Sequence, residues 1–209
     1  EIALAGDFGL LAQLVLTLAA MLFAASWWWG AAAFGVIGLG FAAVAAHPVG
    51  HLATRFAVWR DPLEDATGAG WQTLQGLAAV VSGGVTGTGF GMGEANAVPI
   101  VSSDFVYAAL AEDLGVVGCA LILLVWGVIG VRGLIAAGRC AEADERGEAL
   151  LATGIVASLA VQVVLNVAGV INALPMTGIT LPLISHGGSS LVVTLVLCGV
   201  LLGISSRRT

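Results

Sequence analysis

The chain has 209 residues, of which 59% are hydrophobic and only 10% are charged, and its mean hydropathy is +1.04. Soluble domains carry about 25% charged residues and disordered chains are more polar still, so both classes are excluded. The net charge of −6, with seven arginines and no lysine, argues against nucleic-acid binding, which needs clustered positive charge. The strands of a membrane β-barrel would alternate apolar and polar residues, whereas this sequence has unbroken apolar runs. We therefore expect an all-α integral membrane protein, a polytopic helical bundle.

Five apolar runs are long enough to cross the hydrocarbon core of a bilayer, which is about 30 Å thick. They cover residues 8–26, 29–46, 114–136, 149–171 and 189–206. We expect two membrane helices in residues 1–46, a large extracellular loop with short helices in 47–113, and three membrane helices in 114–209. The chain starts at Glu1 without a signal-peptide pattern, and we expect it to be the later part of a longer protein.

The arginines predict the orientation of these helices, because cytoplasmic loops are enriched in positive charge. Most arginines lie near the segment between the third and fourth apolar runs or in the C-terminal tail. Two membrane crossings separate this segment from the tail, so both lie on the same side of the membrane. These arginines are Arg132, Arg139, Arg146, Arg207 and Arg208. Only Arg55 and Arg60 lie in the loop 47–113. We therefore expect the loops 47–113 and 172–188 on the outer side of the membrane.

The segment 47–113 is too long for a structureless connection, since such loops rarely exceed about 12–15 residues. It contains an apolar stretch from Leu74 to Val81. We expect an ordered cap with a short helix over residues 73–82 that dips toward the membrane. Gln72 and Gln75 would lie on one face of this helix, at i,i+3 spacing, as candidate substrate-binding side chains.

Asp104 lies between apolar residues at the expected membrane surface, as the first residue of a short helix predicted over 104–113 with Ser102 or Ser103 as its N-cap. Its carboxylate either stabilises the helix N-terminus or acts as a general base at the boundary between water and lipid. A helix terminus lowers the pKa of a carboxyl group and an apolar setting raises it. Glu112 follows eight residues later, an offset of about 80°, so it is either a second residue near the Asp104 face or a solvated helix end.

Two features of the same loop suit phosphate groups. The glycine run from Gly83 to Gly93 resembles a phosphate loop in composition, but it lacks the Lys–Ser/Thr end. It forms either a nest of backbone amides for a diphosphate or a tight turn that needs positive φ. Arg55 and Arg60 are either partners for a diphosphate or charges at the membrane surface.

The most distinctive segment runs from Leu174 to Ser190, where two prolines and three glycines preclude a regular helix. Its apolar side chains keep it at the membrane surface, so we expect a re-entrant or tightly packed loop over 172–188 that contacts the Asp104 region. Ser185 and Ser189 are its candidate substrate-binding hydroxyls. Such irregular segments also mark transporter sites. Asn166 lies deep in an apolar run and is costly unless paired, which favours a hydrogen bond between helices.

The segment Leu174 to Ser190 resembles the LPxTGxxLPxxSxGGSS signature of the SEDS proteins (shape, elongation, division and sporulation), the RodA/FtsW group. Three other segments resemble motifs of this family: Arg55 to Gln72 (RxxxFxNPxxDPxGxGYQ), Ser103 to Gly115 (TDFxxxxxxEELG) and Ala5 to Gly9 (QPDLG). The chain departs from these patterns at Ser103 for Thr, Asp113 for Glu, Asp61 for Asn, Ala66 for Pro and His186 for an aromatic residue.

The resemblance implies a fold of ten membrane spans, of which this chain would supply the sixth to the tenth. It also implies a peptidoglycan glycosyltransferase that polymerises lipid II, an undecaprenyl-diphosphate-linked precursor, outside the bacterial cytoplasmic membrane. Asp104 falls on the essential aspartate of the family, and we expect it to be the general base on the acceptor 4-hydroxyl. Arg55 or a divalent cation (Mg²⁺ or Mn²⁺) would then stabilise the departing diphosphate, although no residue is assigned as a metal ligand.

Two alternatives stay open for a member of this family. One is a transporter that flips the lipid-linked precursor, which would need a polar pathway through the bundle. The other is a structural partner of a class B penicillin-binding protein, a transpeptidase with which the family works. The predicted spans carry almost no charged residues beyond Arg132, which favours the enzyme over the transporter.

Overall fold

The computed structural model describes residues 8–26, 30, 32, 35, 36, 38, 51–93 and 103–207. Within these residues all regular structure is helical. The helices are α1 (Phe8–Ala24), α3 (His51–Arg60), α4 (Trp71–Gly83), α5 (Val106–Glu142), α6 (Arg146–Val170) and α7 (Gly188–Ser206). The helices α5, α6 and α7 are long and apolar enough to cross a membrane, whereas α1 is apolar but shorter. The fold class expected from composition, a helical membrane protein, is confirmed.

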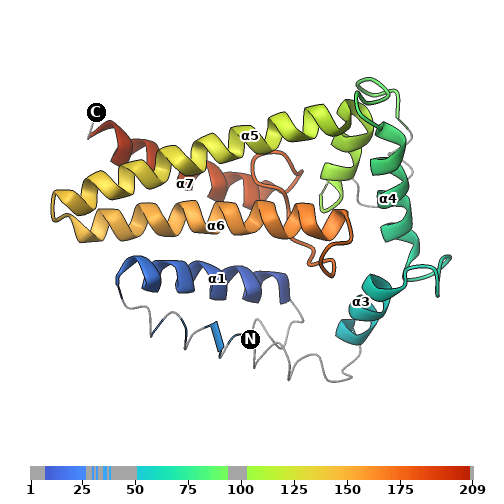
Figure 1. The fold of residues 1–209 in the computed structure, drawn as a ribbon, viewed down its shortest axis with the longest axis horizontal. Helices are drawn as coiled ribbons and strands as arrows, with labels where there is room; N and C mark the ends of the chain where they lie inside the picture. Colours follow the sequence, from blue (N-terminus) through green and yellow to red (C-terminus); the bar gives the residue numbers. More distant parts are fainter. Residues whose placement is uncertain are drawn as a thin grey trace.

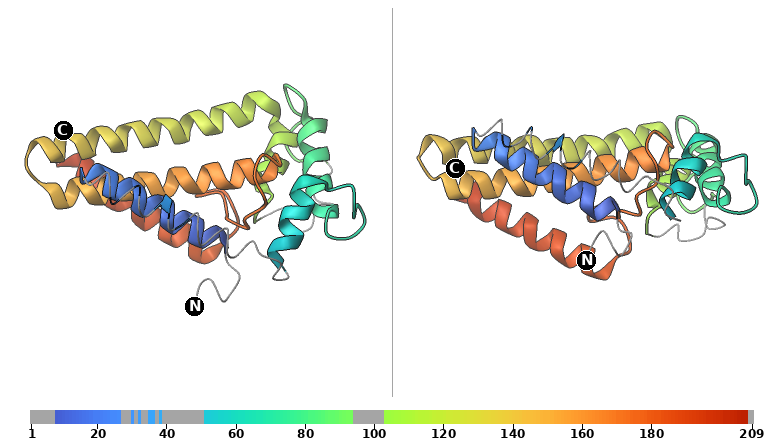
Figure 2. Two further views of the ribbon diagram at one scale, coloured as in Figure 1. Left: turned by 60° about the horizontal axis from the view of Figure 1, so that its bottom comes forward. Right: turned by 90° about the horizontal axis from the view of Figure 1, so that it is seen from below.

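The helix α6 lies at the centre of the bundle, and the other membrane helices pack around it. Figure 1 shows α5 and α1 on opposite sides of α6, and Figure 2 shows α7 beside them. Small residues allow these close approaches, because a side chain at Gly133 would meet Val156 and one at Gly154 would meet Met21. The predicted span 29–46 falls, apart from five residues, outside the described part of the chain.

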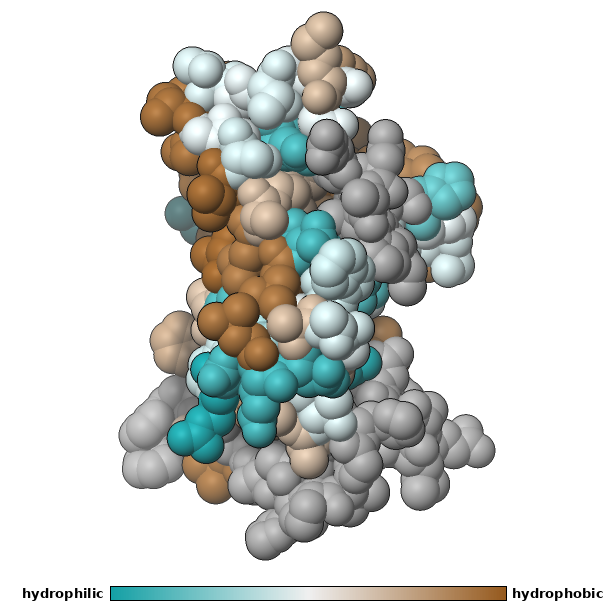
Figure 3. All heavy atoms as spheres, turned by 90° about the vertical axis from the view of Figure 1, so that its right-hand side faces the viewer, coloured by the Kyte–Doolittle hydropathy of each residue, from teal (hydrophilic) through white to brown (hydrophobic). Residues whose placement is uncertain are grey.

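Residues 51–93, which we call the cap, lie at one end of α5 and α6 (Figure 1). The cap comprises α3, a tight turn and α4, and the glycine run follows them. The helix α4 packs against the first turns of α5, where Gly76 lies against the Phe105 ring and Gly83 against the Ala111 backbone. Seen end-on, the molecule shows a band of hydrophobic residues beside clusters of hydrophilic ones (Figure 3).

The helix α5 consists of two helical segments that meet at Gly115, where φ is 67° and ψ is −171°. The glycine run packs against this break and pairs the backbone groups that the break leaves open. Thr88 N–H donates to the Glu112 carbonyl at 2.9 Å, and Val116 N–H donates to the Gly84 carbonyl at 3.0 Å.

Other hydrogen bonds of the glycine run reach Asp113 beside the break, where the amides of Gly89 and Gly91 donate to its carbonyl and carboxylate. These amides therefore serve the fold. The hypothesis of a diphosphate nest in this run is not supported, and the alternative of turns with positive φ holds for Gly87, Gly89 and Gly91.

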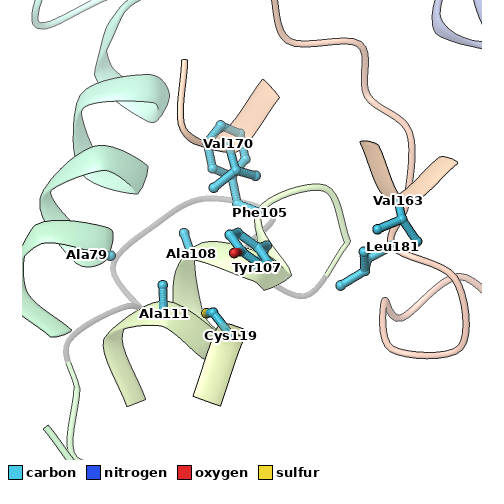
Figure 4. Packing of buried hydrophobic residues seen from close by; sticks show 9 residues of the cluster. All are labelled: Ala79, Phe105, Tyr107, Ala108, Ala111, Cys119, Val163, Val170 and Leu181. Carbon is cyan, nitrogen blue, oxygen red and sulfur yellow. The ribbon is translucent and has the colours of Figure 1, made fainter. Parts of the chain in front are cut away.

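The first turns of α5 form a hydrophobic core with α4, α6 and the segment after α6. Figure 4 shows this core around Phe105, which is 2% exposed. Its labelled members are Ala79, Phe105, Tyr107, Ala108, Ala111, Cys119, Val163, Val170 and Leu181. The prediction that Ser102 or Ser103 caps this helix is wrong, because α5 begins at Val106 and Phe105 occupies the N-cap position without a side-chain hydrogen bond.

Candidate active site

Asp104 lines a cavity of about 180 Å³ that four separate segments enclose. The segments are α3, the start of α4, the turn before α5 and the irregular segment between α6 and α7. The lining residues are Arg55, Val58, Trp59, Ala69, Gln72, Thr73, Asp104, Phe105, Asn172, Met176 and Gly178. The cavity therefore holds one carboxylate and one guanidinium, with the Gln72 amide among its other polar groups.

Side-chain hydrogen bonds fix α3 against the segment that follows α6. Trp59 Nε1 donates to the Asn172 carbonyl at 3.1 Å, and Asn172 Nδ2 donates back to the Trp59 carbonyl at 3.2 Å. Asn172 has a φ of 57°, a conformation that asparagine tolerates better than most residues. Arg55 Nη1 approaches the Thr177 carbonyl at 3.5 Å. These contacts keep Arg55 on the wall of the Asp104 cavity.

The environment of Asp104 increases the proton affinity of its carboxylate. Partial burial raises the pKa of Asp104 above its ordinary value, and this is the largest effect. A hydrogen bond from the Ser103 side chain and the positive charge of Arg55 both lower this pKa, and they oppose the effect of burial without cancelling it. A carboxylate of this kind is suited to accept a proton from a substrate hydroxyl.

Two buried side chains hold the backbone on either side of Asp104. Asn166 Nδ2 donates to the Asp104 carbonyl at 2.9 Å and to the Ile179 carbonyl at 2.7 Å. The Ser185 hydroxyl donates to the Ser103 carbonyl at 2.5 Å and accepts from Leu181 N–H at 2.7 Å. Asn166 therefore links α6 to two loops, which differs from the helix–helix bond that its position in an apolar run suggested.

Gly178 brings the segment after α6 directly beside the carboxylate. Its φ is 74°, and a Cβ on it would lie 3.6 Å from Asp104 Oδ2. The backbone at Gly178 thus forms the cavity wall next to the acid.

The two glutamines expected on one face of a short helix differ in their position. Gln72 lines the Asp104 cavity, whereas Gln75, which is half-buried on α4, is not among the described residues that line it. Gln72 lies in the first turn of α4, nearest to α3. The role of Gln75 in substrate binding is therefore not supported by its position.

The expectation that Glu112 lies near the Asp104 face needs correction. Glu112 is 6% exposed and faces α4 and the glycine run. Ser82 Oγ donates to Glu112 Oε1 at 3.3 Å, and a Cβ on Gly93 would lie 2.6 Å from Glu112 Cδ. Helical spacing misplaced this residue because Asp104 precedes α5 and does not follow its helical periodicity.

The two serines of the distinctive segment also lie apart. Ser185 is 6% exposed, and its hydroxyl is engaged with backbone groups of the Asp104 region. Its position supports a structural contact and not a substrate contact. Ser189 is exposed and lines a second cavity of about 340 Å³ between α1, α6 and α7. Gly178 lines both cavities, so the cavity that Ser189 lines adjoins the Asp104 cavity.

A third cavity, of about 430 Å³, adjoins the Asp104 site and is almost entirely apolar. It is lined by Leu11, Ala12, Val15, Leu16, Ala19, Gly35, Gly38, Arg55, Phe56, Leu165, Leu174, Pro175, Met176 and Thr177. Arg55 and Met176 line both this cavity and the Asp104 cavity. Arg55 therefore lies at the junction between an apolar cavity and a polar one.

Possible metal ligands gather elsewhere in the described residues. Cys140, Glu145 and Glu148 have ligand atoms within 4.8 Å of one another at the turn between α5 and α6. This turn lies at the opposite end of the two helices from Asp104 (Figure 1). Near Asp104 the described chain brings together no such group of three.

The sequence patterns did not single out Trp59 and Asn172, although the reciprocal hydrogen bonds of these two residues hold α3 against the site. A signal was available for Asn172, since an asparagine at the end of an apolar run often adopts positive φ. No local signal identifies Trp59, because its partner lies 113 residues away.

Comparison with known proteins supports the resemblance found in the motifs. The family model FTSW_RODA_SPOVE, described as "Cell cycle protein", matches residues 1–209. The chain is 42% identical over 155 residues to "Peptidoglycan glycosyltransferase RodA" of Mycobacterium tuberculosis H37Rv, covering 74% of this chain and 32% of that protein. It is 41% identical over 154 residues to "Stage V sporulation protein E" of Bacillus subtilis 168, covering 72% of this chain and 41% of that protein.

A solved structure has the same fold. It is described as "Structural coordination of polymerization and crosslinking by a peptidoglycan synthase complex" and matches with a TM-score of 0.75 and 27% identity, over 99% of this chain and 58% of that one. The chain thus spans about a third to two fifths of the length of these curated relatives. Because the family model matches the whole chain, and because the motifs around Asp104 meet in one site, this chain belongs to the FtsW, RodA and SpoVE family of membrane proteins.

Proposed function

We propose that this chain carries the catalytic carboxylate of a peptidoglycan glycosyltransferase that polymerises lipid II. The observation that carries the proposal is the placement of Asp104 in a polar cavity with Arg55, next to a larger apolar cavity that Arg55 also lines. A carboxylate with a raised pKa suits a general base. The names of the curated relatives support the same reaction class.

In the proposed reaction the Asp104 carboxylate accepts the proton of the acceptor 4-hydroxyl as that oxygen attacks the anomeric carbon of the donor. The bond from the anomeric carbon to the diphosphate oxygen breaks, and its electron pair leaves with the undecaprenyl diphosphate. The attack comes from the side opposite the leaving group and inverts the anomeric centre. Glycosidases need two carboxyl groups because their leaving groups are poor, whereas a diphosphate leaves readily and one carboxylate suffices.

The junction at Arg55 fits a donor that is charged at one point and apolar beyond it. Negative charge develops on the diphosphate as it departs, and a guanidinium binds phosphate oxygens with two parallel hydrogen bonds. The undecaprenyl tail would occupy the apolar cavity beside α1, and the sugars would enter the cavity of Asp104 and Gln72. A divalent cation, Mg²⁺ or Mn²⁺, would add to the charge of Arg55 if the diphosphate carries one into the site.

We infer that the site faces the outer side of the bacterial cytoplasmic membrane, as the distribution of arginines predicts. The partner would be a class B penicillin-binding protein, which crosslinks the new strand. The solved relative is described as a complex that coordinates polymerisation and crosslinking, which supports this partnership.

The test is polymerisation of lipid II by the purified full-length protein with its partner, measured as glycan strands on a gel. We expect strands whose length and yield depend on the protein. A protein that moves lipid II across vesicle membranes but forms no strands would instead support the transporter alternative.

Arg55→Gln should shift the pH dependence of polymerisation. The base must be ionised, so kcat/KM falls as the pH drops through the pKa of Asp104. Because the Arg55 charge lowers this pKa, its removal should move the acid limb of the profile to higher pH. It should also raise KM roughly tenfold or more, through the loss of a charged hydrogen bond to the diphosphate.

The matched control is Arg60→Gln, since Arg60 is exposed, ends the same helix and does not line the Asp104 cavity. Its pH profile should equal that of the wild type. An unchanged acid limb in Arg55→Gln would show that the charge of Arg55 does not act on the base.

A further inference from the structure

We propose that Asn166 and Ser185 are positioning residues for the base, which together fix the backbone at Asp104 and the direction of its Cα–Cβ bond. This proposal rests on the function of Asp104 proposed above. Neither side chain is among the residues that line the Asp104 cavity. Both act through the backbone on either side of the acid.

The peptide groups that flank the Asp104 α-carbon are each held from outside the local chain. Ser185 donates to the carbonyl of Ser103, which belongs to the peptide before Asp104. Asn166 donates to the carbonyl of Asp104 itself, which belongs to the peptide after it. Two fixed peptide planes leave the α-carbon no free backbone rotation. The bond from Cα to Cβ of Asp104 therefore has one direction.

The same two side chains fix the opposite wall of the cavity. The second Asn166 N–H donates to the Ile179 carbonyl, and Ser185 Oγ accepts from Leu181 N–H. Both partners lie within three residues of Gly178, whose backbone approaches Asp104 Oδ2. The turn that carries the acid and the segment 178–181 therefore form one hydrogen-bonded unit.

Phe105 holds this unit from the other side. Its side chain is 2% exposed and packs against Gly76 of α4, where any larger residue would meet the ring. The residue that follows the acid is thus anchored by packing, while the residues before and at the acid are anchored by hydrogen bonds. A carboxylate on a backbone held in this way can transfer a proton without a backbone rearrangement.

Asn166 is not the residue that stability alone would select at this position. It is 1% exposed in an apolar helix, and its Oδ1 atom is buried without a hydrogen-bond partner among the described residues. A buried acceptor in this state costs stability, and leucine, which has a similar shape, would remove that cost. The two N–H groups of this amide donate to the backbone carbonyls of Asp104 and Ile179, which a leucine could not do.

The test compares Asn166→Leu and Ser185→Ala with wild-type full-length protein in the lipid II polymerisation assay. We expect kcat to fall by about 10- to 100-fold, the scale of a misplaced catalytic group, while KM changes little because neither residue lines the substrate cavity. Thr153→Val is the matched control, since it removes a partly buried hydroxyl of the same helix that donates to the Ala149 carbonyl one turn earlier. It should retain the wild-type kcat.

The double variant Asn166→Leu/Ser185→Ala should lose little more activity than the more damaging single variant, because both changes release the same acid. In the Asp104→Asn background neither change should matter. Fully additive losses of activity would overturn the proposal. Losses in the Asp104→Asn background as large as those in the wild-type background would also overturn it and leave a general structural role.

Hydrogen exchange measured by mass spectrometry tests the positioning role independently of the proposed reaction. Ser185→Ala should speed exchange of the Leu181 amide and of the peptide around Asp104. Asn166→Leu should speed exchange of the peptide around Asp104. Exchange in α7 should be unchanged in both variants. Unchanged exchange around Asp104 in both variants would overturn the positioning role, whatever the reaction. If exchange responds as expected but Asp104→Asn still polymerises lipid II, the positioning stands and the assignment of the base fails.

Discussion

The Asp104→Asn variant should polymerise lipid II about 10²- to 10⁴-fold more slowly than the wild type, the range that general base catalysis supplies. The amide has the size of the carboxylate but cannot take the proton of the acceptor hydroxyl. The fold around it should persist, because Asn166 and Ser185 bond to backbone carbonyls of this turn and not to the Asp104 side chain. Strand formation by purified full-length protein measures the effect.

Asp61→Asn is the matched control for this change. Asp61 is an exposed carboxylate of the cap that accepts a hydrogen bond from its neighbour Leu63 N–H at 3.0 Å, and it does not line the Asp104 cavity. Its variant should polymerise at the wild-type rate. If Asp104→Asn also kept the wild-type rate while folding normally, Asp104 would not be the base. If it lost only lipid flipping, the transporter alternative would be favoured.

Gly115→Ala should lower the free energy of unfolding by about 2–6 kcal/mol. The backbone conformation at Gly115, which is essentially restricted to glycine, costs any other residue about 1–3 kcal/mol, and overpacking adds about 1–3 kcal/mol. At Gly115 the φ is 67°, and the new methyl group would meet the backbone of Gly87 and Val85, which cannot rotate away. The measurement is thermal unfolding of the purified protein in detergent, read by loss of the monodisperse peak.

The variant Gly91→Ala separates the cost of the backbone conformation from the cost of overpacking. Gly91 also has positive φ, at 73°, but a Cβ there would meet nothing within 4 Å. It should therefore lose only the backbone contribution, and its N–H can still donate to Asp113. Equal losses for the two variants would show that the glycine run does not pack against the break in α5 as closely as described.

The sequence alone determined the three long apolar helices α5, α6 and α7, because lipid offers backbone groups no hydrogen-bond partners and a long apolar run therefore has to form a helix. The runs predicted at 149–171 and 189–206 correspond to α6 (Arg146–Val170) and α7 (Gly188–Ser206). Sequence also identified the family, since the segment Leu174 to Ser190 combines residue types that a regular span excludes.

Only the tertiary structure decided what surrounds Asp104. The carboxylate meets Arg55 from α3 and Gly178 from the segment after α6, and its backbone is held by Asn166. Periodicity describes the faces of one helix, and it misplaced Glu112 because Asp104 lies in a turn before that helix. The residues that meet the acid are separated from it by up to 74 positions in the sequence (Gly178), and contacts over such separations depend on how helices pack, which no local pattern encodes.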